Sequence, residues 1–261
     1  MRHFMNLQKG PFESIRSGTK DIELRLYDDK RRKINKGDII EFNHEGEIVE
    51  VVVLNLHLFN SFKELYASFD KVRFGYKEDE VALPSDMEQY YPREEIEKSG
   101  VVGIEIMLIN KVNNAILTDN GICPTCFDKN NNHVLFGDDK ETLIYKDDLI
   151  ECFFVGNPRA RGHVAISSVN HYKDMMDITD DLCDYVFKFS KKMMNIIKEV
   201  FESESVYLAT MCDGPMNHFH IQLIPRYSFE KRGSTNFVKE RFSYTYEPEK
   251  MARVKELIGT R

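Results

Sequence analysis

The sequence predicts an α+β protein of two domains, a small β-barrel followed by an antiparallel sheet packed against a long helix. Three observations support this prediction. Residues 21–27 alternate between apolar and polar side chains, which indicates a strand with one buried face. Apolar residues keep helical spacing from Leu182 to Val200, behind an N-cap at Thr179. Residues 110–114 are polar and turn-prone and Cys-x-x-Cys follows soon after, so we place the domain boundary near residues 110–120.

The first domain is expected to consist mainly of short strands. Residues 11–56 are rich in strand patterns, and turns separate one pattern from the next. The expected strands cover residues 21–27, 39–42, 48–57 and 101–109, and a short amphipathic helix covers residues 61–69. Short strands with few helices are typical of a small barrel.

The second domain is expected to hold strands on either side of the long helix. These strands cover residues 142–145, 149–155, 163–167, 205–211 and 217–224. The expected organisation of the chain is a first domain at 1–112, a linker at 113–120, a second domain at 121–235 and a C-terminal extension at 236–261.

Composition narrows the class of protein. The net charge of −7 at pH 7 argues against a surface that binds nucleic acid over its whole extent. No stretch approaches the roughly 18 apolar residues of a membrane span, so no membrane partner is expected. Five cysteines, two of them in Cys123-Pro-Thr-Cys126, suit a metal or thiol site in a reducing compartment better than a disulfide framework. We therefore expect a cytoplasmic protein.

The segment from Asn217 to Arg226 carries the strongest signal of chemistry. On a strand, His218, His220 and Gln222 project from one face, and the apolar residues between them project from the other face. An imidazole near neutral pH is a nucleophile toward phosphorus, and the phosphoramidate that it forms can be broken again. The alternative is two histidines and an amide that only hydrogen-bond over the sheet.

This segment resembles the signature of the histidine-triad (HIT) family, with Gln222 at its third position. Residues 161–171 resemble the upstream strand of the superfamily, in which Gly-His opens the strand and a second histidine closes it. Glutamine at the third position resembles the transferase branch, in which the middle histidine becomes nucleotidylated. The resemblance implies that His220 is the nucleophile and that Gln222 binds a phosphate oxygen of the intermediate. An amide cannot relay a proton, which favours transfer or phosphorolysis over hydrolysis.

Two further residues are assigned to the site with alternatives left open. The resemblance implies that His163 points at the substrate phosphates, and the alternative is that it braces the strand. Arg226 either contacts a phosphate of the substrate or caps the end of its strand in solvent.

Cys123 and Cys126 have the spacing that lets two thiolates share one tetrahedral metal ion. The resemblance to the transferase branch supplies His171 and His218 as the other two ligands of a structural Zn²⁺ site. A competing ligand set uses His133, and a reduced cysteine pair without metal is the third interpretation.

Residues 11–27 and 37–42, extended by residues 100–106, resemble an ASCH domain, a small β-barrel related to PUA RNA-binding folds. The resemblance implies a cleft that binds RNA or nucleotides. Lys20 matches a lysine of the branch that hydrolyses acetylated cytidine, but Glu23 stands in place of that branch's threonine, which argues against the same chemistry. Glu23 and Arg25 share a strand face, either as a cleft pair or as charges on a solvated sheet.

The motifs together predict an enzyme that acts on a nucleoside phosphate or dinucleoside polyphosphate by transfer, phosphorolysis or hydrolysis, through a nucleotidyl-His220 intermediate. The first domain is expected to bind RNA or nucleotide, and the HIT resemblance allows a homodimer. The alternative is a regulatory protein that binds RNA or nucleotide without turnover.

Overall fold

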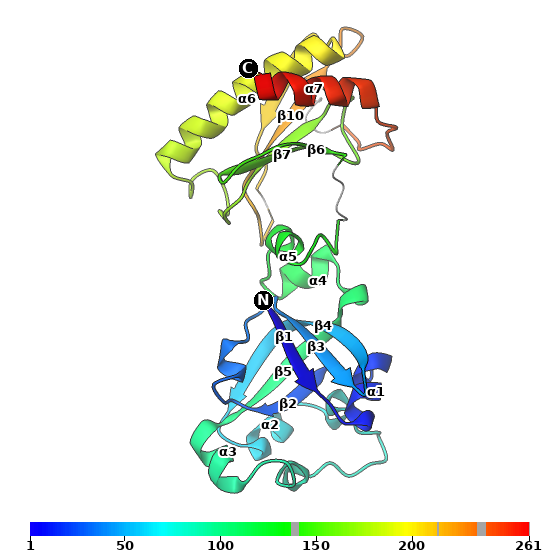
Figure 1. Ribbon diagram of the computed structural model, residues 1–261, viewed down its shortest axis with the longest axis vertical. Coiled ribbons are helices and arrows are strands. Elements are labelled where there is room, and N and C mark those ends of the chain that lie inside the picture. The colour runs from blue at the N-terminus through cyan, green and yellow to red at the C-terminus, as the bar shows by residue number, and fades with distance from the viewer. Residues whose placement is uncertain (137–140, 213, 234–238, 261) are drawn as a thin grey trace. The chain divides into compact units, whose positions relative to one another are not determined.

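The computed structural model describes residues 1–136, 141–212, 214–233 and 239–260. The chain divides into two compact units, Met1–Asn131 and Asn132–Arg261, each with its own five-stranded sheet (Figure 1). The predicted α+β class is confirmed. The expected limit of the second domain between residues 235 and 236 lies outside the described residues.

The first unit is a curled half-barrel sheet with short helices around it. Its strands, in the order in which they pair, are β1 (Arg2–Asn6), β3 (Ile39–His44), β4 (Glu47–Phe59), β5 (Val101–Leu108) and β2 (Ile22–Leu26). Its helices are α1 (Lys9–Ser17), α2 (Phe62–Ser68), α3 (Arg93–Ser99), α4 (Asn114–Asp119) and α5 (Pro124–Asn130), with 3₁₀ turns at Arg31–Lys33, Lys71–Phe74, Pro84–Met87 and Ile109–Lys111. A bulge between Val53 and Asn55 shifts the β4–β5 register, and such bulges bend a long strand and help a sheet to curl.

Two elements of the first unit differ from the sequence-based expectation. Helix α1 occupies part of the segment that was expected to be β-rich. Its residues Phe12 and Ile15, three positions apart, are buried in the core, and Gly18 ends the helix at φ 78°. Strand β1 was not expected, and it pairs in parallel with β3, more than thirty residues further along the chain. An edge strand that pairs with a distant segment has little alternation of apolar and polar residues in its own sequence, so it is hard to predict.

The second unit is an antiparallel sheet with two helices on one face (Figure 1). Its strands pair in the order β6 (Leu143–Lys146), β7 (Ile150–Phe154), β8 (Val164–Ser168), β10 (His220–Arg226) and β9 (Ser205–Ala209). Its helices are α6 (Asp180–Phe201) and α7 (Pro248–Thr260). The hydroxyl of Thr179 accepts a hydrogen bond from the backbone N–H of Leu182 at 3.3 Å, so the predicted N-cap is present.

The core of the second unit determines which way the signature strand faces. Helix α6 buries side chains at helical spacing, and these pack in one cluster with Phe219, Ile221 and Leu223. The apolar face of β10 is therefore directed at the helix layer, and His220 and Gln222 project from the opposite face. Helix α7 adds Met251 and Val254 to the same cluster, so the expected C-terminal extension includes a packed part of this unit.

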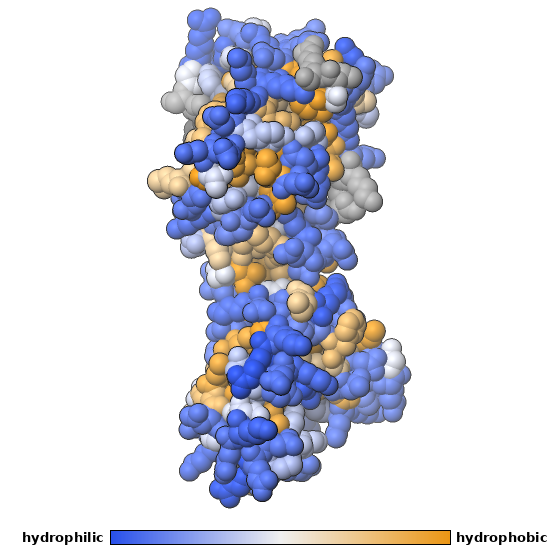
Figure 2. Space-filling view, turned by 60° about the vertical axis from the view of Figure 1, so that its left-hand side comes forward, coloured by the Kyte–Doolittle hydropathy of each residue, from blue (hydrophilic) through white to orange (hydrophobic). Residues whose placement is uncertain are grey.

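Hydrophilic side chains dominate the face of the molecule shown in Figure 2. Among the described residues, no helix combines the length and the apolar character that crossing a membrane requires.

Candidate functional site

The candidate site lies on β10, between its neighbours β8 and β9. His220 pairs with Ser167 of β8, and Gln222 lies between Ala165 of β8 and Ala209 of β9. The strand was expected to begin at Asn217, but regular pairing begins at His220. His218 and Gln222 are buried, whereas His220 is only half-buried and so is the most accessible of the three.

The hydrogen bonds of His220 determine which of its ring nitrogens carries the proton. Its Nδ1 lies 2.9 Å from the main-chain carbonyl oxygen of His218, which only accepts, so Nδ1 carries the proton. The lone pair of the neutral ring is then on Nε2. The side-chain nitrogen of Gln222, which only donates, lies 3.3 Å from that Nε2. The amide therefore lies where it can donate to an oxygen of a phosphoryl group bound to Nε2.

His163, immediately before β8, is directed at Gln222. The backbone N–H of Arg159 donates to its Nδ1 at 3.0 Å, so the neutral ring carries its proton on Nε2. Burial lowers the pKa of His163 to about 3, Arg241 and Arg159 act in the same direction, and a hydrogen bond with Gln222 opposes them. Among the described residues, His163 Nε2 and Gln222 Oε1 are both buried, and neither atom meets the geometry of a hydrogen bond. His163 is thus neutral, and its interaction with Gln222 places its protonated nitrogen on the side of that amide.

His218 contributes to the site with both its main chain and its side chain. Its carbonyl oxygen fixes His220, and its ring Nε2 donates to the carbonyl oxygen of Ser168 at 2.8 Å. With the proton on Nε2, the lone pair of the neutral His218 ring is on Nδ1, the nitrogen that can bind a metal ion. A carbonyl that holds the second nitrogen of a ligating histidine is a common feature of metal sites.

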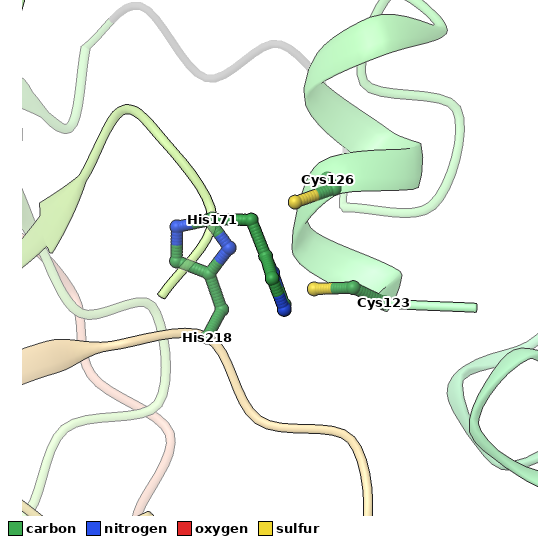
Figure 3. A group of neighbouring side chains, drawn as sticks. All are labelled: Cys123, Cys126, His171 and His218. Carbon is green, nitrogen blue, oxygen red and sulfur yellow. The ribbon is translucent and has the colours of Figure 1, made fainter. Parts of the chain in front are cut away.

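Cys123, Cys126, His171 and His218 form a compact group of ligand atoms, all within 4.8 Å of one another (Figure 3). Cys123 is the N-cap of α5 and Cys126 is in its first turn, so the two sulfur atoms project from the same end of the helix. Two sulfur and two nitrogen donors in one tight group fit a tetrahedral zinc ion, with bonds of about 2.3 Å to sulfur and about 2.0 Å to nitrogen. His133 is not part of this group.

The electrostatics of the cysteine pair favour a bound cation. The Cys123 sulfur, followed by burial, raises the pKa of the Cys126 thiol well above its usual range. Two thiolates at this separation repel each other, and a divalent cation removes that repulsion. Cys152 is buried and Cys183 and Cys212 are half-buried, and none of the three belongs to the group.

Arg226 lies at the end of β10 and is buried. Its guanidinium forms an ion pair with Glu204 at 2.8 Å and donates to the hydroxyl of Ser205 at 3.2 Å. Its Nη1 donates to the carbonyl oxygen of Tyr227 at 3.2 Å. These protein groups engage the guanidinium, and substrate binding by Arg226 stays a prediction.

In the first unit, Lys20, Glu23 and Arg25 form a charged triad. Lys20 Nζ lies 3.0 Å from Glu23 Oε2, and Arg25 Nε lies 2.8 Å from Glu23 Oε1. The side chains are 8%, 4% and 15% exposed, so the triad is buried rather than solvated. Burial acts to raise the pKa of Glu23, but the two cations outweigh it and leave that pKa below its ordinary value. The triad carries a net charge of +1, and Lys20 also lines a cavity of about 190 Å³ together with Lys111.

Sequence reasoning missed the groups that hold the site residues in place. The backbone N–H of Arg159 and the carbonyl oxygen of Ser168 orient two of the histidines. Main-chain groups exist at every residue, so no residue type marks them in a sequence.

The fold and the site define a two-domain protein whose second domain presents a histidine, with its tautomer fixed, beside an amide on a central strand. Comparison with protein families identifies both domains. The chain contains an ASCH domain, matched over residues 5–110, and a HIT domain, matched over residues 137–229. Both resemblances seen in the sequence are therefore confirmed, and the HIT domain supports a nucleotide-binding protein of that family.

The relatives of known sequence carry HIT-like names without an assigned activity. The chain is 28% identical over 98 residues to an uncharacterized HIT-like protein of Methanocaldococcus jannaschii, which covers 36% of this chain and 75% of the relative. It is 26% identical over 112 residues to an uncharacterized HIT-like protein of Borreliella burgdorferi, which covers 38% of this chain and 79% of the relative. Among solved structures, it is 37% identical to a hypothetical protein over 41% of this chain and 99% of that one, with a TM-score of 0.37.

Proposed function

We propose that the HIT domain is a nucleotidyl-transferring enzyme in which His220 forms a covalent bond to the α-phosphorus of a nucleotide. The observation that carries this proposal is the tautomer of His220. A main-chain carbonyl holds the proton on Nδ1 and leaves the lone pair on Nε2, beside the amide of Gln222. A neutral imidazole that is already oriented needs no base to activate it.

In the first step, the Nε2 lone pair of His220 attacks the α-phosphorus, and the bond from phosphorus to the leaving oxygen breaks. The leaving group departs with that electron pair, and the ring becomes a cation that still donates from Nδ1 to the carbonyl oxygen of His218. The Gln222 amide donates to a non-bridging oxygen of the bound phosphoryl group. In the second step, a deprotonated acceptor oxygen attacks the same phosphorus, the N–P bond breaks, and its electron pair returns to Nε2 of His220.

The identity of the third signature residue supports transfer or phosphorolysis. Gln222 donates from its nitrogen to His220, while its oxygen faces His163. Because an amide does not titrate, Gln222 does not protonate a leaving group. The reaction therefore favours leaving groups that are stable as anions, such as a phosphate chain, and acceptors that are already deprotonated, such as inorganic phosphate.

We propose that Cys123, Cys126, His171 and His218 bind a structural zinc ion. When bound there, zinc would hold these four side chains in fixed positions relative to one another. Of these ligands, His218 also holds the nucleophile through its carbonyl oxygen. Zinc binding and the orientation of His220 are thereby linked through a single residue.

For the ASCH domain, we propose that the Lys20, Glu23 and Arg25 triad belongs to a site for RNA or nucleotide. The net positive charge of the buried triad and the cavity beside Lys20 support binding of a phosphate or an electron-rich base edge. The reduced cysteine pair that the zinc site requires suits the cytoplasm. Homodimer formation stays a prediction.

The experiment that tests the enzymatic proposal is a panel of nucleoside triphosphates and dinucleoside polyphosphates, with covalent adducts detected by mass spectrometry after an alkaline quench. We expect turnover of at least one substrate, with a nucleoside monophosphate adduct on His220. His220→Ala removes adduct and turnover, while His57→Ala, in the first domain, is the matched control and keeps both. Tight binding of nucleotides without turnover or adduct favours the regulatory alternative instead.

A further inference from the structure

Two arginines lie beside the candidate active site, on segments far apart in the sequence. Arg159 precedes β8, and Arg241 belongs to the C-terminal segment before α7. The two segments are joined by hydrogen bonds. The backbone N–H of Phe242 donates to the carbonyl oxygen of Pro158 at 3.2 Å, and Arg241 Nη1 donates to the carbonyl oxygen of Asn157 at 2.8 Å. Arg159 Nη1 donates in turn to the carbonyl oxygen of Lys239.

Both arginines act on His163, and the backbone N–H of Arg159 donates to Nδ1 of that ring at 3.0 Å. After burial, the charges of Arg241 and Arg159 are the largest causes that lower the pKa of His163. The two arginines also act on each other, since burial and the charge of Arg159 lower the pKa of Arg241. His163 faces Gln222, which is hydrogen-bonded to Nε2 of His220. The two positive charges thus act on His163, and Gln222 lies between His163 and the proposed nucleophile His220.

Within the described part of the chain, these arginines have no acidic partner. Among the described residues, neither Arg159 nor Arg241 forms an ion pair with a carboxylate, and Arg159 Nε is buried without a hydrogen-bond partner. Arg161, in the same loop as Arg159, is different, because its guanidinium donates to both oxygens of Glu247 at 2.7 and 3.0 Å. Two neighbouring cations without a counter-ion repel each other, and a polyanion between them relieves that repulsion.

We propose that Arg159 and Arg241 form a subsite for the phosphate chain of the leaving group, which makes the enzyme selective for nucleoside or dinucleoside polyphosphates. This inference rests on the proposed covalent role of His220. As the bond from the α-phosphorus to the leaving oxygen breaks, negative charge accumulates on the departing phosphate chain. Gln222 does not protonate that chain, so fixed guanidinium groups stabilise the charge in its place.

The C-terminal segment is fastened in a way that suits this role. Besides its ion pair with Arg161, Glu247 accepts a hydrogen bond from the hydroxyl of Tyr244 at 2.6 Å. Helix α7 follows directly and is buried in the core of the second unit through Met251 and Val254. The backbone around Arg241 is therefore anchored on both sides, while the side chain itself is exposed and accessible to a ligand.

The test compares two substrates with the same nucleoside, a dinucleoside tetraphosphate and a nucleoside 5′-phosphoramidate, whose leaving group carries no phosphate chain. For Arg241→Ala and Arg159→Ala, we expect kcat/KM to fall about 10- to 100-fold for the tetraphosphate. The expected change for the phosphoramidate is less than about threefold. Arg241→Lys keeps the charge and recovers part of the loss. Arg253→Ala, an exposed arginine of α7 paired with Glu256, is the matched control and leaves both substrates unchanged.

Equal losses for the two substrates, or no loss for the tetraphosphate, overturn the subsite. Binding of inorganic tripolyphosphate, measured by calorimetry on folded variants, tests it without any chemistry. We expect Arg241→Ala to weaken this binding about tenfold or more, and unchanged binding overturns the inference. If tripolyphosphate binds through the arginines but no His220 adduct forms with any substrate, the subsite stands and the proposed covalent function fails.

Discussion

The main-chain carbonyl oxygen of His218 accepts a hydrogen bond from Nδ1 of His220 at 2.9 Å, and the side chain of the same His218 belongs to the group of four metal ligands. One residue thus connects the proposed zinc site with the proposed nucleophile. We therefore expect a change in the metal site to alter the position of the His218 main chain, and with it the tautomer and the direction of His220.

Loss of a zinc ligand is expected to reduce activity without removing any group that touches the substrate. Cys126→Ser should release stoichiometric zinc, lower the melting temperature and reduce kcat about tenfold or more, because His220 loses its fixed orientation. Metal analysis, thermal unfolding and kinetics of the purified variant measure the three effects. Cys183→Ser, outside the ligand group, is the control. Full activity and stability of the wild-type protein in a strong chelator, with no zinc bound, argue against the site.

His163 is expected to act by orienting Gln222, and two isosteric substitutions separate the two nitrogens of its ring. Glutamine places an N–H donor near the position of Nε2, whereas asparagine places its polar atoms near Nδ1. We expect His163→Gln to keep more of kcat than His163→Asn, by about tenfold, since only glutamine keeps a donor that can orient the Gln222 amide. Steady-state kinetics decide between them. Equal rates for the two variants indicate a role in bracing the strand through Arg159 alone.

The ion pair between Glu247 and Arg161 predicts a pH dependence of stability. Burial acts to raise the pKa of Glu247, but the hydrogen bonds from Arg161 and Tyr244 lower it from 4.5 to about 2. Since the pKa is lower in the folded state, the contribution of Glu247 is complete above about pH 4.5 and is lost as the pH falls toward 2. Unfolding free energies of the wild type and Glu247→Gln should therefore differ at neutral pH and converge between pH 4.5 and 2. A constant difference over that range speaks against the ion pair.

Glu23 is expected to be essential to the stability of the ASCH domain. Glu23→Gln leaves Lys20 and Arg25 as buried cations without a carboxylate, which costs about 3–5 kcal/mol when one partner of a buried pair is removed. Glu13→Gln, at an exposed ion pair with Arg16, should cost less than about 1 kcal/mol. Denaturant unfolding measures both values. A small effect of Glu23→Gln indicates that the three charges are solvated in solution.

The sequence predicted the fold class and the face of the signature strand because both depend on local periodicity. Phe219, Ile221 and Leu223 alternate with His218, His220 and Gln222, and only one of these two sets fits against a helix. Helix α1 and strand β1 were missed, since they depend on burial of two side chains and on pairing with a distant strand. In helix α7, Met251 and Val254 have the three-residue spacing of a buried helix face. The segment lies outside both recognised motifs, and no helix was expected there.

The residues that hold the site in place were beyond the sequence for a different reason. The orientation of Gln222 depends on His163, whose own tautomer depends on a backbone N–H of Arg159. Arg241 reaches this neighbourhood from a segment about eighty residues further along the chain. Only the tertiary structure brings such groups together.

The central claim is that the nucleotide is transferred through a covalent bond to His220. The most direct measurement is the stereochemical course at the α-phosphorus, with a substrate made chiral there by sulfur substitution. Two successive in-line displacements, first by Nε2 of His220 and then by the acceptor, each invert the configuration, so we predict overall retention. Inversion means a single displacement by the acceptor itself, and this result would contradict the nucleotidyl-His220 intermediate.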